Sequence, residues 1–413
     1  MSTPTPSPYR PGFATQPPLL AGRQHLVQLV ETAVRTSGNR RQSFQVLYGP
    51  RGVGKTVLLD RYAAIALERK WAVVRHEARS PGDPIGAIVE QLHDCAGLTK
   101  KLSRELVELR ERWGEESQTL NLGVYRRESK RERRDAIPVA QQFAGAVLAV
   151  GEHCTKDRRG LMILVDEVQE VHPDELSVFG PIMQDLSRRP ELTAMIVFGG
   201  LPDTPGIVTD AVTYGERMAF HPIDNLDNDA TLQALAGPAD AAGRPFDGDA
   251  LAVLADATGG YPYFVQLFGD YAWQTSDGHP RITLADATSA IDLARHDSER
   301  GLYVARWKKL PAGEQTYLTA MARLSTSDPV RTGVIADVLG KPITALSAVR
   351  NRLLDRGIIV APSTGHVAAS IPGFLDYVLT VSEASKAAGG RPASKTRITT
   401  SPNRKPRQPG RIT

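Results

Sequence analysis

The chain contains 413 residues, of which 41% are hydrophobic and 23% charged, and its formal net charge is +4. These values are typical of a soluble globular protein with two or three domains. No apolar run is long enough to span a bilayer, and residues 1–18 lack the apolar segment of a secretory signal. Cys95 and Cys154 lie far apart in sequence, which favours reduced core thiols over a disulfide or a metal site. The composition therefore predicts a cytoplasmic protein that does not contact membranes.

The first residues lead into a loop around which the rest of the chain is organised. Residues 1–18 are rich in Ser, Thr and Pro and are predicted to form a disordered arm. Apolar residues recur at helical spacing in residues 19–34, which indicates an amphipathic helix. The β-branched and aromatic run Phe44–Tyr48 predicts a strand, and the residues after Thr56 predict a helix. Between them lies a Gly-rich stretch of the form G-x-x-x-x-G-K-[ST].

This order of strand, loop and helix predicts a phosphate-binding loop rather than an ordinary strand–turn–helix connection. Its glycines let backbone N–H groups point at phosphates, and the helix N-terminus adds partial positive charge. Lys55 is expected to reach the β- and γ-phosphates, and Thr56 to place its hydroxyl on Mg²⁺. The predicted ATP-binding stretch comprises Gly49, Pro50, Arg51, Gly52, Val53, Gly54, Lys55, Thr56 and Val57.

Strands and helices alternate after this loop, which predicts an α/β fold with a doubly wound parallel sheet. The run Leu161–Val165 is entirely apolar, as in parallel strands covered on both faces. Strands are expected at 71–76, 161–165 and 193–198, and helices at 84–96, 137–153 and 173–188.

Residues 100–135 interrupt this pattern and are interpreted as an insertion. A charged helix is expected from Lys100 to Arg112, followed by a Gly-rich and polar break at 114–123 and a basic segment at 126–134. A solvated helix face with i,i+4 ion pairs is the favoured interpretation, and a dedicated binding patch is the alternative.

Two acidic residues follow the apolar strand, at the edge of the sheet where such folds bind ligands. Asp166 is expected to hold Mg²⁺, directly or through water, and Glu167 to orient and activate the attacking water. A solvated acid pair is the alternative. Arg217 follows the last buried strand and is expected to stabilise transition-state charge, in trans if subunits form a homo-oligomer. A surface ion pair with Glu216 is the alternative for this arginine.

From about residue 226 the predicted elements are helical. Helices at 231–242, 249–257 and 261–275 suggest a small helical lid, followed by a helix that Thr283 caps. Three helices and a hairpin between residues 314 and 370 predict a winged helix-turn-helix. The domain boundaries are a disordered arm at 1–18, an ATPase core at 19–222, a lid at 223–300, a winged helix at 301–380 and a basic disordered tail at 381–413.

The third helix of the winged helix, residues 344–356, carries polar residues that suit contacts with duplex DNA. Arg and Asn suit base edges, and a lysine suits phosphates. The alternative is that the module docks onto protein. The candidate DNA-binding residues are Lys341, Ser347, Arg350, Asn351 and Arg352.

Taken in order, these motifs resemble the AAA+ P-loop ATPases, on their initiator-type and STAND-like branch. The phosphate loop resembles Walker A, and residues 161–167 resemble Walker B. Gly22 and Arg23 resemble the "GRE" box near the adenine, and Tyr214–Arg217 resembles the arginine-finger region. A group of bacterial and archaeal ATP-binding proteins shares the motifs Gly200-Leu201-Pro202, YxER and GGYPYF with residues 19–380 of this chain.

The chain departs from the initiator pattern in the lid. Initiator-type proteins carry an arginine in the lid helix, where this sequence has Tyr261, Pro262 and Tyr263. Pro262 resembles the proline that lies near the adenine in STAND switches. The strand ending Phe198-Gly199-Gly200 lacks the expected polar residue. The resemblance therefore implies an ATP- and Mg²⁺-dependent switch with slow hydrolysis, associated with DNA through the winged helix. A STAND-like signalling ATPase whose winged helix contacts protein is one alternative, and a motor is a weaker one.

Overall fold

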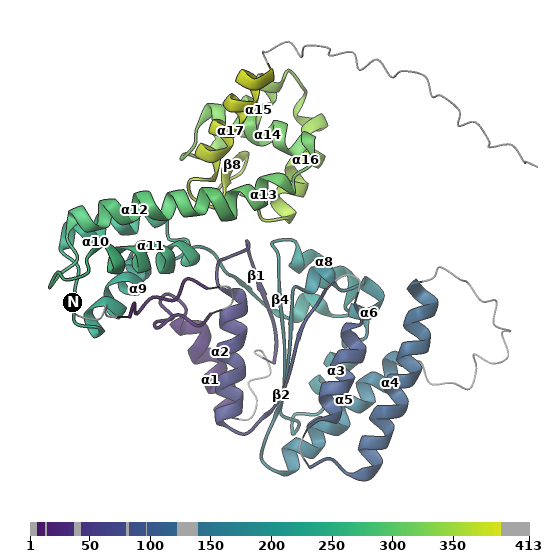
Figure 1. Ribbon diagram of the computed structural model, residues 1–413. Coiled ribbons are helices and arrows are strands. Elements are labelled where there is room, and N and C mark those ends of the chain that lie inside the picture. The colour runs from purple at the N-terminus through teal and green to yellow at the C-terminus, as the bar shows by residue number, and fades with distance from the viewer. Residues whose placement is uncertain are drawn as a thin grey trace, which may run out of the picture.

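The computed structural model describes residues 6–12, 15–36, 43–79, 82–95, 97–121 and 139–389. At its centre lies a parallel five-stranded sheet with the order β2-β3-β4-β1-β5, which confirms the predicted α/β fold (Figure 1). Because all five strands are parallel, their carboxyl ends meet at one edge, and the loop after β1 lies between the ends of β4 and β5. The strands are β1 (Phe44–Tyr48), β2 (Ala72–Glu77), β3 (Leu161–Asp166), β4 (Ala194–Gly200) and β5 (Ala219–Pro222).

Helices cover both faces of the sheet, and alternate residues of each strand divide between them. In β3, Met162 and Leu164 pack with α1 and α2, whereas Ile163 and Val165 pack on the other face with α3, α5 and α7. This burial on both faces explains the continuous apolar run of β3. The helices of the core are α1 (Gln24–Arg35), α2 (Lys55–Glu68), α3 (Pro84–His93), α4 (Lys100–Asn121), α5 (Val139–Lys156), α6 (Pro173–Ser177), α7 (Phe179–Arg188) and α8 (Thr204–Ala211).

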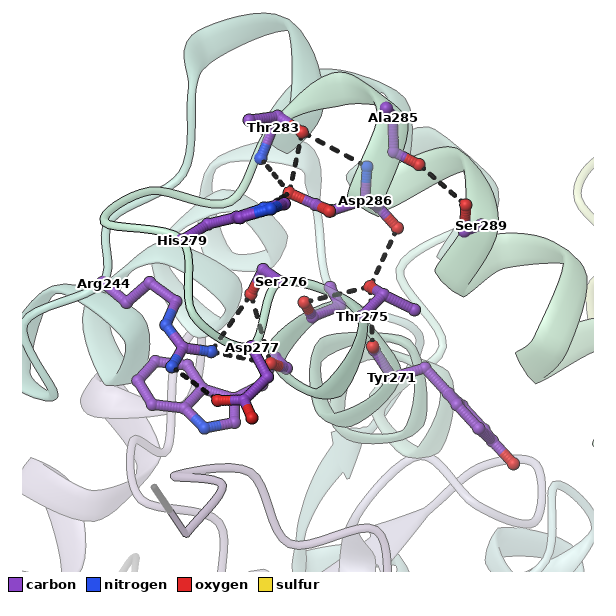
Figure 2. Close-up of polar contacts among 12 residues, drawn as sticks. Arg244, Tyr271, Thr275, Ser276, Asp277, His279, Thr283, Ala285, Asp286 and Ser289 are labelled. Carbon is purple, nitrogen blue, oxygen red and sulfur yellow. Dashed lines mark hydrogen bonds and ion pairs between the residues drawn. The ribbon is translucent and has the colours of Figure 1, made fainter. Parts of the chain in front are cut away.

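The lid is helical, as expected. It consists of α9 (Asn228–Ala241), α10 (Gly248–Thr258), α11 (Pro262–Thr275) and α12 (Leu284–Ser298). Figure 2 shows the end of the lid, where Thr283 and Asp286 form a capping box at the start of α12. Burial alone raises the pKa of Asp286, but hydrogen bonds from Thr283 and His279 hold that pKa below its ordinary value. The prediction that Thr283 caps this helix is confirmed.

A π-helical turn, Glu299–Tyr303, joins α12 to α13 (Val304–Lys308) and leads into the last module. This module contains a three-stranded antiparallel sheet with the order β6-β8-β7, in the arrangement of a winged helix. It packs with the lid in one continuous hydrophobic cluster that includes Phe264, Tyr303 and Phe374. Its elements are α14 (Ala312–Leu324), β6 (Val330–Arg331), α15 (Thr332–Leu339), α16 (Ile343–Asp355), β7 (Ile359–Val360), β8 (His366–Ala369) and α17 (Phe374–Gly389).

The structure corrects the expected N-terminal arm. Tyr9 is only 3% exposed, and its hydroxyl donates a hydrogen bond to the backbone carbonyl of Leu235 in α9. The Gln16 side chain donates to the carbonyl of Val57 at the start of α2, at 2.8 Å. One aromatic residue that fills a gap in the lid therefore orders a segment whose composition is typical of disorder.

Three other expectations change. The break expected at 114–123 is wrong up to residue 121, because α4 continues through Gly114 to Asn121; the basic segment 126–134 lies outside the described residues. Strand β5 was not expected, since it has only four residues. Helix α17 extends to Gly389, beyond the expected start of the tail at residue 381, and the tail after residue 389 lies outside the described residues.

Candidate functional site

The predicted phosphate loop connects the carboxyl end of β1 to the N-terminus of α2, at the edge of the sheet over which the winged helix lies (Figure 1). Gly52 has a left-handed backbone with φ of 86°. A Cβ atom at this position would lie 1.9 Å from the Tyr261 hydroxyl of the lid, so only glycine fits. The loop is therefore shaped both by its own turn and by the lid that touches it.

Lys55 is the first residue of α2 and is 7% exposed. Its Nζ atom donates to the carbonyl oxygens of Gly49, at 2.8 Å, and Pro50, at 2.7 Å. Burial lowers the pKa of Lys55 to about 8, an effect that Glu167 and Asp166 oppose. A buried ammonium group held by neutral carbonyls is a binding group for an anion such as a phosphate.

Thr56 and Asp166 lie side by side, although they come from different elements. The Thr56 hydroxyl donates to Asp166 Oδ2 at 2.7 Å, and Asp166 is 2% exposed at the end of β3. On the neighbouring strand, a Cβ atom at Gly199 would lie 2.8 Å from Asp166 Oδ1. The glycine that replaces the expected polar residue of β4 therefore gives this carboxylate its space. A hydroxyl beside a carboxylate is an oxygen donor pair that fits Mg²⁺.

Glu167 adopts a left-handed backbone, with φ of 53°, directly after β3. Its side chain forms an ion pair with Arg51 at 3.4 Å and accepts a hydrogen bond from Gln169 Nε2. Gln169 Oε1 accepts in turn from the backbone N–H of Leu201, at 3.1 Å, beyond the end of β4. Sequence reasoning missed Gln169, which connects the carboxylate to the next strand. Its position two residues after Glu167 was the only available signal.

The lid contributes Tyr261 to the site instead of an arginine. Tyr261 is 2% exposed, and its hydroxyl donates to the carbonyl of Arg51 at 3.2 Å. Pro262 follows it at the first position of α11. Arg306 of α13 lies close enough to Lys55 to contribute to its lowered pKa. Neither Tyr261 nor Arg306 was predicted as a site residue.

Gly22 and Arg23 lie where the start of the first helix meets the start of the lid. A Cβ atom at Gly22 would come within 2.9 Å of the Ala230 side chain in α9. The Arg23 guanidinium donates to the carbonyl of Asp224. Burial lowers the pKa of Arg23, and the neighbouring carboxylates of Asp224 and Asp227 oppose this. Both residues thus join the first helix to the start of the lid.

Arg217 is not brought into the phosphate loop. Its side chain is 73% exposed, lies 3.8 Å from Glu216 and stacks over the Tyr214 ring at 4.7 Å. The alternative raised from the sequence, a surface ion pair with Glu216, is thus present in the structure.

The winged helix touches the phosphate loop through the turn after α16. A Cβ atom at Gly357 would lie 3.1 Å from Pro50 Cα and 3.4 Å from the Arg51 nitrogen. Of the candidate DNA-binding residues, Lys341, Ser347 and Asn351 are exposed. Arg352 donates to Oε1 of the buried Glu314 at 3.1 Å, although half of its side chain is exposed. Arg350 is partly buried, and its Nε atom has no partner among the described residues.

Comparisons with known proteins agree with this geometry. Residues 19–197 match a family model described as an AAA ATPase domain, and residues 300–378 match a domain of unknown function (DUF8462). The fold is similar to that of a Walker-type ATPase of Pyrococcus abyssi, with a TM-score of 0.56 and 14% identity over 91% of this chain and 98% of that chain. No curated protein matches the sequence.

Two further structures are 15% identical over 92% of this chain. They are the Aeropyrum pernix Orc1 protein in complex with DNA, with a TM-score of 0.44 over 96% of its chain, and Cdc6p from Pyrobaculum aerophilum, with 0.43 over 98%. Both scores are below 0.5, so the likeness of fold rests on the Pyrococcus abyssi protein.

Proposed function

Since residues 19–197 form an AAA+ P-loop ATPase domain, we propose that the protein is a nucleotide-dependent switch that hydrolyses ATP slowly. The observation that carries this proposal is that lid and winged helix both touch the phosphate loop. Tyr261 bonds to the carbonyl of Arg51, and Gly357 packs against Pro50. A change in the loop on nucleotide binding would therefore reach both modules directly.

The residues of the site fit ATP with Mg²⁺. Lys55 would hold the β- and γ-phosphates, Thr56 and Asp166 would hold the metal, and Glu167 would position the attacking water. Bound Mg²⁺ would neutralise charge that develops on the phosphates. Slow turnover follows from the engagement of Glu167 with Arg51 and Gln169, since these contacts must rearrange before the carboxylate can accept a proton from water.

Duplex DNA is the partner that we propose for the exposed face of α16. Ser347 and Asn351 are exposed on this helix and Lys341 in the turn before it, whereas Arg352 is engaged with Glu314. Lysine suits phosphate contacts, and asparagine suits an adenine edge. The end of this helix is continuous with the turn that touches the phosphate loop, so the nucleotide state can alter DNA contacts.

A signalling ATPase whose winged helix contacts protein is the second candidate, and a specific observation favours it. The face formed by α15 and the start of α16 exposes apolar side chains: Val338 is 46% exposed and Ile343 54%. Exposed apolar residues suit a protein partner better than a DNA backbone.

Arg217 is suited to a contact between subunits of a homo-oligomer. Its guanidinium is exposed and does not reach the phosphate loop of its own chain, so it could serve the ATP of a neighbouring subunit. Light scattering with and without ATP tests for such a homo-oligomer.

The experiment that tests the proposed function measures binding of ATP, and then binding of duplex DNA. Lys55→Ala should reduce ATP affinity at least about 100-fold, because it removes a charged group that bonds to phosphate. Lys101→Ala, at a side chain that is 87% exposed on α4, is the matched control. Unchanged ATP binding in Lys55→Ala would contradict the nucleotide site. DNA binding that weakens with salt and with Lys341→Ala supports the DNA-associated switch, and its absence supports the signalling ATPase.

A further inference from the structure

Arg306 is a partly buried arginine whose charge has no bonded partner in the part of the chain that the structure describes. Its guanidinium forms no hydrogen bond and no ion pair with any residue there. It lies on α13, the short helix between the π-helical turn and the winged helix. A partly desolvated guanidinium usually has a bonded partner, so its position requires an explanation.

The turn before α13 packs onto the part of the lid that touches the phosphate loop. Tyr303, three residues before Arg306, packs against Phe264 with ring centroids 6.3 Å apart, and Phe264 packs against Tyr261 at 5.0 Å. Tyr261 bonds to the carbonyl of Arg51, so this row of rings connects the segment that carries Arg306 to the loop.

The charges around Arg306 favour the binding of an anion. Burial lowers the pKa of Arg306; Tyr261 and Glu167 oppose this effect, and Arg51 adds to it. The positive charge of Arg306 also contributes to the lowered pKa of Lys55. Arg51, Lys55 and Arg306 thus lie close enough for their charges to interact, and Arg51 already pairs with Glu167 at 3.4 Å. An anion between these cations would remove their mutual repulsion.

We propose that Arg306 binds the γ-phosphate of ATP and transmits the presence of this phosphate to the winged helix. The γ-phosphate is favoured over the other phosphates because Arg306 lies within the field of Glu167, the residue expected beside the attacking water. The proposal rests on the proposed function, since it requires that ATP occupy the loop.

The π-helical turn explains how such a contact would act. Irregular helical turns of this kind are frequent at functional sites, and here the turn separates the lid helix α12 from Arg306. Tyr303, the last residue of the turn, donates to the carbonyl of Pro372 in the winged helix, at 2.6 Å. A phosphate that draws Arg306 inward therefore acts on a segment already bonded to the winged helix.

The test compares affinities for a non-hydrolysable ATP analogue and for ADP, by calorimetry, in the full chain. Arg306→Ala should weaken binding of the analogue about 10- to 100-fold, the range for a charged hydrogen bond, and change ADP affinity less than about twofold. Arg306→Lys should weaken it less, because the charge remains but the planar fork is lost. Arg300→Ala, at an exposed arginine in the π-helical turn, is the matched control.

A second readout follows the linker itself. Hydrogen exchange in residues 299–310 should be slower with the analogue than with ADP in the natural protein, and this difference should disappear in Arg306→Ala. Equal losses for both nucleotides, or no loss, would overturn the proposal while leaving the proposed function intact. Failure of the natural protein to bind ATP would overturn the proposed function itself. If Arg306→Ala does not fold, judged by thermal unfolding without nucleotide, Arg306→Lys decides the same question.

Discussion

Two arginines in the same half of the molecule, Arg244 and Arg306, differ in their partners. Arg244 is 8% exposed at the end of the lid and donates to Trp273 O at 2.8 Å and to Ser276 Oγ at 3.2 Å (Figure 2). Its guanidinium also stacks over the Trp273 ring at 4.2 Å and pairs with Asp277. Arg306 has no such bonds among the described residues.

The comparison distinguishes a charged side chain that stabilises the fold from one that is available to bind a ligand. Where the guanidinium is bonded within the chain away from the phosphate loop, removal of the arginine should affect stability and leave binding intact. Where a charged group lies beside the phosphate loop, substitutions should affect binding or hydrolysis and leave stability nearly unchanged. The predictions below test this separation, from the largest expected effect to the smallest.

The largest effect is expected at Glu167. Replacement by Gln keeps the shape of the side chain but removes the base that activates water, so the rate of ATP hydrolysis should fall at least about 100-fold. Affinity for ATP should change little, because Lys55 and Thr56 are intact. Phosphate release and calorimetry measure the two quantities. Glu170→Gln, three residues later in the same turn, is the control, and a hydrolysis rate preserved in Glu167→Gln would contradict the assigned role.

A smaller effect, on stability alone, is expected at Arg244. Arg244→Met leaves the Ser276 hydroxyl and the Trp273 carbonyl with fewer partners in a buried site, which should cost about 2–3 kcal/mol. Thermal unfolding should show the loss, and ATP affinity measured well below the transition should be unchanged. Arg281→Met removes an exposed ion pair with Asp247 and should cost less than about 1 kcal/mol. Equal losses in the two variants would show that the buried cluster has no special role.

The smallest effect is the pH dependence of ATP binding. Lys55 has a pKa of about 8, so its charge is present below this pH and is lost above it. ATP affinity should be constant at lower pH and fall by up to about tenfold per pH unit above 8. Affinity that falls equally below pH 8 would contradict this assignment.

Stability should follow the opposite trend in the same range. The pKa of Lys55 is lower in the folded protein than the ordinary value of about 10.4, so the unfolded chain binds more protons between these values. The free energy of unfolding without nucleotide should therefore rise, not fall, as pH increases from 8 towards 10. Lys55→Arg, which stays charged, should show neither trend. Above pH 8, ATP affinity should fall while the free energy of unfolding rises. These opposite changes distinguish an effect at the site from general unfolding.

Much of the nucleotide site could be predicted from sequence because its residues are adjacent in the chain or follow strands of one parallel sheet. Thr56 and Asp166 are 110 residues apart, yet both follow from the rule that carboxyl ends of parallel strands share an edge. The contribution of α13 could not be predicted in this way. The segment that carries Arg306 is connected to the loop through the packing of Tyr303, Phe264 and Tyr261, and no local pattern encodes that packing.

The same limit explains the errors outside the site. Polar and Gly residues after Arg112 suggested a break, but α4 continues to Asn121; its buried residues Leu106, Leu109 and Trp113 lie before the expected break. The arm was predicted from composition, which does not reveal that Tyr9 fits beside Gly269 of α11, where a Cβ atom would lie 2.6 Å from the ring. Long-range packing overrides local composition in the arm.

The N-terminal arm limits the movements open to the lid. Tyr9 and Arg10 bond to α9 and α11 of the lid, Gln16 bonds to the start of α2, and the chain of the lid enters it separately at residues 223–227. The arm is thus a second connection between the lid and the core, beside the covalent one at residues 223–227. While its bonds hold, the separation of Tyr9 from Gln16 is bounded by the chain between them, which can span at most about 25 Å when fully extended. Opening of the lid beyond this length would require the arm to detach from the lid or from α2.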